Sequence, residues 1–238
     1  MFGLKNENTL GKRLTILFYS IALIEVITEL LSDIVLVFIF KPLLSIGIMA
    51  LYWNASKERN RTFFVVLFLS MITNILFIPG TENLLFMGLI VFLAHRLLLI
   101  SYVVQLIKLK DYIPLFIAVL PFLFIFSYLL SISTEIQMKS YFLLIVQNVL
   151  ISVIGGLALS QFVMNYNKMN SWLLIFGLLS VTQYFIVFIE KYYLSNIAPI
   201  AFRPLAMLLN ASVYYVFYRF VIDAEKVNAE SVILLDNN

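Results

Sequence analysis

The sequence predicts an all-α membrane protein, a polytopic helical bundle with about eight transmembrane helices. Only 12% of its 238 residues are charged and 63% are hydrophobic, whereas a soluble domain has roughly 25% charged residues. Apolar runs recur along the chain, each near the ~20 residues that a helix needs to cross a bilayer. A membrane barrel needs ~10-residue segments of alternating polarity, and runs such as Leu115 to Leu130 do not alternate.

Eight apolar segments follow one another and are separated by short polar stretches. The first two are divided only by Ser32 and Asp33, so a single re-entrant or broken helix is the main alternative there. We expect one transmembrane domain over residues 1–222 and a short polar cytoplasmic tail over 223–238, frayed or forming a brief amphipathic helix. The segments are Leu14–Leu31, Ile34–Trp53, Thr62–Ile78, Leu84–Ile107, Ile113–Ile132, Tyr141–Met164, Ser171–Ile189 and Ile197–Ile222.

Lysine and arginine near the helix ends predict the orientation, because cytoplasmic loops carry an excess of both. With eight spans, eleven such residues fall on one side of the membrane and only Lys139 and Lys191 on the other. We therefore expect both termini in the cytoplasm and a plasma membrane location, the inner membrane of a bacterium. The eleven are Lys5, Lys12, Arg13, Lys57, Arg59, Arg61, Lys108, Lys110, Lys168, Arg219 and Lys226.

The first apolar segment carries an acidic stripe. Glu25, Glu29 and Asp33 are spaced four residues apart, which places them on one face of a helix. Isolated charges inside a bilayer cost at least ~2.5 kcal/mol each and normally pair within the bundle. The stripe is therefore expected to form the anionic wall of a polar cavity within the membrane.

Three cations lie inside other apolar segments and are the expected counterparts of the stripe: Lys41, Arg96 and Arg203. Two alternatives remain open. Glu29, Asp33 and Lys41 can instead lie at the outer interface, with the lysine snorkelling. A buried structural ion pair can also account for Glu25 and Arg96.

Neutral polar residues are expected in the same layer, between the membrane midplane and its outer third. They are Asn74, His95, Gln183 and Asn210. Two short patterns recur: FLSMITNILF around Asn74 resembles GLLSVTQYFI around Gln183, and FKPL from Phe40 resembles FRPL from Phe202. In the second pattern a proline follows a cation and is expected to loosen the backbone hydrogen bonds.

Composition excludes several classes of site. The chain has no cysteine and one histidine, so disulfides, thiolate metal sites and multi-histidine metal centres are ruled out. We expect no metal and no cofactor. Nothing in the charge pattern indicates nucleic acid binding, and no protein partner can be inferred. The expected partner is a membrane lipid.

Three stretches are similar to the YhhN family of lysoplasmalogenase-type membrane proteins. They are KPLL from Lys41 to Leu44, LFLSMITNILF followed by FMGLIVFLAH ending at His95, and FGLLSVTQYFIVF from Phe176 to Phe188. The resemblance covers most of the chain from the second apolar segment to the eighth and has the same number of spans. It implies a helical bundle that handles lysophospholipids.

The chain departs from the family at the residues that carry its chemistry. Family members have an aspartate at each of the positions of Asn74 and Gln183, and these aspartates are the proposed acid and base that cleave a vinyl ether. Amides hydrogen-bond but do not exchange a catalytic proton at ordinary pH. The family mechanism therefore does not carry over intact.

Three hypotheses follow. In the first, the protein is a lipid hydrolase in which Glu25 or Glu29 replaces the acids missing at Asn74 and Gln183. In the second, it is a non-catalytic relative that binds a lysophospholipid or similar amphiphile, and the third is a carrier or scaffold with a purely structural charged layer. The expected substrate-binding residues are Lys41, His95, Arg96 and Arg203.

Overall fold

The computed structural model describes residues 9–31, 33–109, 111–133, 136, 138–194 and 199–236, with side chains to residue 230. Within these ranges the chain is all-helical, which confirms the predicted class, and eight helices match the eight apolar segments. They are α1 (Thr9–Leu30), α2 (Ile34–Ala55), α3 (Arg61–Phe77), α4 (Glu82–Ile107), α5 (Ile113–Ile132), α6 (Met138–Met164), α7 (Lys168–Tyr192) and α8 (Phe202–Asp236).

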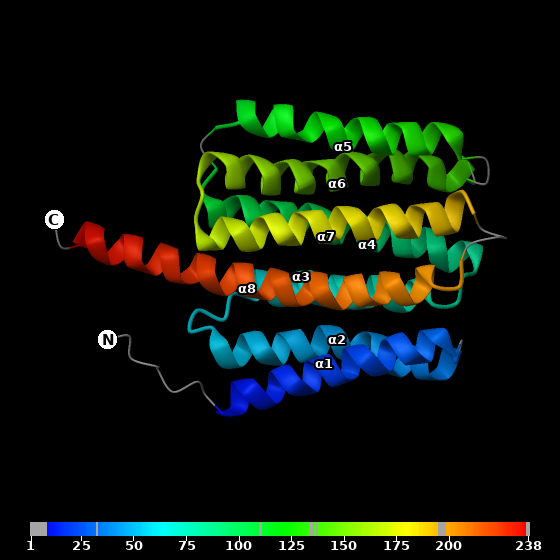
Figure 1. Cartoon of the computed structure of the whole chain (residues 1–238), viewed down its shortest axis with the longest axis horizontal. Coiled ribbons are helices and arrows are strands. Elements are labelled where there is room, and N and C mark those ends of the chain that lie inside the picture. Colours follow the sequence, from blue (N-terminus) through cyan, green and yellow to red (C-terminus); the bar gives the residue numbers. More distant parts are fainter. Residues whose placement is uncertain are drawn as a thin grey trace.

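The helices run alternately up and down in one bundle (Figure 1). We call the end where α1 begins the proximal end and the opposite end the distal end. The connections after α2, α4 and α6 lie at the proximal end, and α8 also ends there, projecting beyond the other helices. The predicted loop cations Lys5 and Lys110 lie outside the described residues.

Six helices are long and apolar enough to cross a membrane: α2, α4, α5, α6, α7 and the Phe202–Glu230 part of α8. These helices and the composition indicate an integral membrane protein. α3 is apolar but has 17 residues, or about 26 Å of helix against a hydrocarbon core of about 30 Å. α1 is not among the six because charged residues occur near both of its ends.

The boundary between α1 and α2 is a genuine chain reversal. Asp33 precedes α2, and its Oδ1 accepts hydrogen bonds from the N–H groups of Val35 (3.0 Å) and Leu36 (3.2 Å). A side-chain oxygen at this position satisfies N–H groups that have no partner inside the helix. α1 and α2 are separate helices that lie side by side and run in opposite directions (Figure 1), and Asp33 caps α2 instead of extending the acidic stripe.

The bounds of α8 differ from the predicted segment. Its predicted start, Ile197, lies outside the described residues, and the helix begins at Phe202. Pro204 thus falls in the first turn, where its missing N–H is not needed, whereas Pro42 lies inside α2. The expected loosening of the backbone therefore applies to FKPL and not to FRPL. Past Ile222 the helix continues without a break to Asp236.

Aromatic side chains fill the proximal half of the bundle. The ring of Phe63 stacks on those of Tyr52 (3.9 Å between centroids) and Phe217 (5.6 Å), and Phe217 also contacts Phe176 at 5.1 Å. These residues are all buried. Their packing closes the proximal side of the bundle and leaves the distal side for the cavity described below.

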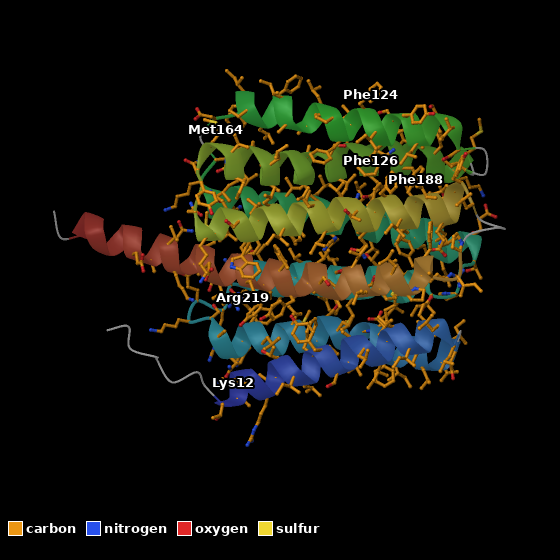
Figure 2. The ribbon with its side chains drawn as sticks, in the orientation of Figure 1. Lys12, Phe124, Phe126, Met164, Phe188 and Arg219 are labelled. Atoms are coloured by element: carbon orange, nitrogen blue, oxygen red, sulfur yellow. The ribbon has the colours of Figure 1, made fainter. Side chains whose placement is uncertain are left out.

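α5 lies at the periphery of the bundle and exposes most of its side chains. Figure 2 shows its two labelled residues on opposite sides, with Phe124 on the outer surface and Phe126 towards the neighbouring helices. Phe124 is 76% exposed and Phe126 only 1%. An apolar helix with most of its side chains exposed is stable only in an apolar solvent.

Candidate functional site

A cavity of about 590 Å³ lies inside the bundle. Most of its wall comes from α3, α4, α7 and α8, with smaller parts from α1, α2 and α6. α4 contributes Leu85, Leu89, Phe92, Arg96 and Leu99. These residues are three or four positions apart, so they form one face of the helix.

The cavity reaches the surface at the distal end. Arg203 lines it there and its side chain is 68% exposed. On α3 and its C-cap residue the wall extends from Ile78 down to Val66, which corresponds to about 18 Å of helix rise. The floor next to the proximal aromatic core is apolar, formed by Val66, Leu99 and Phe217 among others.

The structure brings together seven of the eight predicted site residues: Glu29, Lys41, Asn74, His95, Arg96, Gln183 and Arg203 all line this cavity. Glu25 does not. The depth inferred along each predicted helix is compatible with one cavity for all of them except Arg203, because a straight helix rises by a constant ~1.5 Å per residue.

The amides Asn74 and Gln183 are each hydrogen-bonded to α8. Asn74 Nδ2 donates to Tyr214 Oη at 2.8 Å, and Gln183 Nε2 donates to Asn210 Oδ1 at 3.1 Å. Asn210 and Tyr214 are one helical turn apart and share a face. One face of α8 therefore holds both amides, which come from α3 and α7.

The Tyr214 hydroxyl is the centre of a wider network. It lies 3.3 Å from Ser45 Oγ, which donates to it, and 2.6 Å from Ser70 Oγ. Because a hydroxyl has one donor and two acceptor positions, Tyr214 accepts from Asn74 and Ser45 and donates to Ser70. This group joins α2, α3 and α8.

The Arg96 guanidinium is surrounded by one glutamine and two aromatic rings, and none of these groups is a carboxylate. Its Nη1 donates to the backbone oxygen and to Oε1 of Gln147, both at 2.9 Å. Its Cζ lies 4.2 Å from the centroid of the Phe92 ring and 4.4 Å from that of Tyr184. Tyr184 in turn donates to Asn148 Oδ1 at 2.7 Å. No carboxylate of the described residues forms an ion pair with Arg96, so the expected balance with the acids of α1 is not found.

Glu25 is packed behind the cavity wall. It is completely buried, and neither carboxylate oxygen has a hydrogen-bond partner among the described residues. Lys41, which lines the cavity from α2, is the cation whose charge acts on it. The two form no ion pair within 4 Å in the described structure.

Arg203 lies at the mouth, not six residues inside a span as the sequence depth predicted. The error arises because α8 begins at Phe202, only one residue before it. Arg203 Nε forms an ion pair of 2.8 Å with Glu190 Oε1 of α7. Next to Glu190, the Lys191 ammonium lies 5.6 Å from the ring of Phe77. The cavity mouth therefore carries charges of both signs that largely cancel.

Sequence analysis missed several residues that build the site. Gln147 was detectable in principle as an amide inside an apolar segment, and Glu190 as an acid directly after one. Tyr184 and Tyr214 carried no such signal, since tyrosine is also common at membrane interfaces. Among the residues that the structure describes, no three His, Asp or Glu side chains are placed to hold a metal ion.

Comparison of the chain with protein-family models, with curated proteins and with solved structures finds no match.

Proposed function

We propose that the protein binds a single-chain amphiphile, such as a lysophospholipid, in the central cavity. The observation that carries this proposal is a cavity of about 590 Å³ that has an apolar floor, contains buried cations and opens at the distal end. Small-molecule sites measure about 300–1,000 Å³ and are mostly apolar with a few placed polar groups. The similarity to YhhN proteins agrees with a lysolipid.

A purely structural role is less well supported. A structural role of the charged residues predicts an interior closed by ion pairs, because isolated charges in a bilayer are costly. Arg96 instead rests on an amide and two aromatic rings beside an open space. A ligand would supply the missing interactions.

The proposed orientation has both termini in the cytoplasm and eight crossings. The distal end, where the cavity opens, then faces the outside. Support comes from the distribution of lysine and arginine and from the position of the start of α1 and the end of α8 at one end of the bundle. The shorter α3 lines the cavity and crosses within the bundle.

The proposal is tested with a substitution whose larger side chain fills the cavity. Val213 lines it, and Val213→Trp adds an indole to the available space; Val65, 46% exposed on the lipid side of α3, provides the matched control Val65→Trp. Radiolabelled oleoyl lysophosphatidate is the probe, with purified protein in non-ionic detergent. We expect wild type and Val65→Trp to retain the probe and Val213→Trp to lose it. Equal retention by all three proteins would contradict the proposal.

A second candidate is hydrolysis, because Glu29 shares the cavity with Asn74 and Gln183. In this case Glu29 supplies the acid or base that the amides lack. Aldehyde release from a lysoplasmalogen is measured for wild type, Glu29→Gln and an Asn74→Asp, Gln183→Asp double variant. Activity in wild type that disappears in Glu29→Gln would favour hydrolysis. Activity in the double variant alone would favour a binding protein with an intact cavity.

A further inference from the structure

We infer that Arg96 forms an anion subsite inside the cavity, which recognises a compact anionic head group, a phosphate monoester or a carboxylate. The inference rests on the proposed function and adds the place and the charge of the ligand's polar group. Arg96 is fourteen residues into α4, about 21 Å of helix rise from its distal end. The ligand's anion is therefore bound deep in the bundle and not at the mouth.

The first support is an uncompensated charge. Arg96 is 4% exposed, lines the cavity and has no acidic partner among the described residues. A buried charge is costly unless it is paired and hydrogen-bonded. The cavity beside it is the place from which a negative charge can be supplied.

The second support is preorganisation. The guanidinium lies against the rings of Phe92 and Tyr184, and Gln147, which contacts its Nη1, donates from its own Nε2 to the Leu89 backbone oxygen at 3.3 Å. Gln147 contacts only one of the three guanidinium nitrogens. A guanidinium has five N–H donors in a planar fork that matches carboxylate and phosphate oxygens.

The third support is two unpartnered polar atoms on the wall of the same cavity. Asn210 Nδ2 and His95 Nδ1 have no hydrogen-bond partner in the described structure, and their residues are 7% and 9% exposed. Buried polar atoms nearly always have a partner. The Asn210 amide is a donor whose oxygen is already engaged by Gln183, so an anionic acceptor suits it.

The other cations of the cavity are opposed by charges of the protein itself. Arg203 is paired with Glu190, the charge of Glu190 also acts on Lys191, and the charges of Lys41 and Glu25 act on each other. Arg96 is the cation of this wall without a described counter-charge. A head group that also carries an ammonium would bring a like charge towards the guanidinium, so lysophosphatidate or a fatty acid is favoured over lysophosphatidylcholine.

The test compares three probes on purified protein in non-ionic detergent: oleoyl lysophosphatidate, the neutral oleoyl monoacylglycerol and inorganic phosphate. Wild type is expected to bind lysophosphatidate about tenfold or more tighter than monoacylglycerol, as for hydrogen bonds to a charged group. Arg96→Gln is expected to lose that preference and to bind monoacylglycerol unchanged. Arg61→Gln, which removes an exposed arginine at the start of α3 outside the cavity wall, is the matched control and is expected to keep the preference.

Several results would overturn the inference while leaving the amphiphile site intact: no preference in wild type, loss of the preference in Arg61→Gln, or equal weakening of both lipids in Arg96→Gln. If Arg96→Gln does not fold, Arg96→Lys and Asn210→Ala are measured instead. Each is expected to show a reduced preference for lysophosphatidate over monoacylglycerol. Failure of both lipids to bind wild type would refute the proposed function. In that case Arg96-dependent binding of inorganic phosphate would still support the subsite and would identify a free anion as its ligand.

Discussion

Asn74 on α3 donates a hydrogen bond of 2.8 Å to the hydroxyl of Tyr214 on α8. The amide thus uses its N–H₂ group, a donor that a carboxylate at this position would lack. This contact and those of Ser45 and Ser70 make the tyrosine the main polar link between the two sides of the cavity.

Tyr214→Phe is expected to destabilise the protein. It removes the hydroxyl and leaves three polar groups without their partner, at a cost of about 1–2 kcal/mol. Thermal unfolding in detergent measures the effect. Tyr128→Phe makes the same change on the exposed face of α5 and is expected to leave the melting temperature unchanged. An equal shift for both variants would contradict the role of the network.

Glu225 connects the proximal part of α8 to the α2–α3 connection. Its two oxygens accept hydrogen bonds from the hydroxyls of Tyr52 and Ser56, and Tyr52 Oη accepts from the backbone N–H of Asn60 at 2.9 Å. In Glu225→Gln an N–H₂ donor replaces one acceptor, so one hydrogen bond is lost and the connection loosens by about 1–2 kcal/mol.

Hydrogen exchange of residues 56–60 checks this expectation: it should be faster in Glu225→Gln than in wild type. The exposed Glu230 provides the control Glu230→Gln, which should exchange as wild type does. Unchanged exchange in Glu225→Gln would show that the acid does not hold the connection.

Gly156 allows α6 to approach α5 closely. A Cβ at this position would lie 3.0 Å from the backbone nitrogen of Val119 and 3.1 Å from its Cα. Backbone atoms cannot be displaced as a flexible side chain can, so Gly156→Ala is expected to cost about 1–3 kcal/mol.

Gly47→Ala is the comparison for this substitution. Both changes gain the same helix propensity, about 1 kcal/mol, but at Gly47 the nearest neighbour is the ring edge of Phe18 at 3.3 Å. The melting temperature should fall for Gly156→Ala and change little or rise for Gly47→Ala. The opposite order would exclude close helix approach as the reason for Gly156.

The absence of cysteine from the chain makes the proposed orientation directly testable. Tyr193→Cys places an exposed thiol at the distal end, and Asn165→Cys places one at the proximal end. With a membrane-impermeant maleimide on intact cells, Cys at 193 is expected to be labelled and Cys at 165 to be labelled only after permeabilisation. The reverse result would place both termini outside.

The sequence alone was sufficient for the helices and for the layer of polar residues. Apolar runs separated by charges predicted the eight helices, because the bilayer selects for span length and hydrophobicity locally. Constant helical rise placed Asn74, Gln183 and Arg96 at compatible depths, and all three line the cavity. These properties depend on neighbours along the chain.

Only the tertiary structure decided which groups meet. The sequence predicted that Arg96 would balance the acids of α1, but the folded chain places it between Phe92 and Tyr184 and leaves Glu25 buried outside the cavity lining. Contacts between helices depend on the rotation of each helix about its axis and on side-chain rotamers. Composition and spacing leave both undetermined, because every helix of a membrane bundle is apolar on most of its surface.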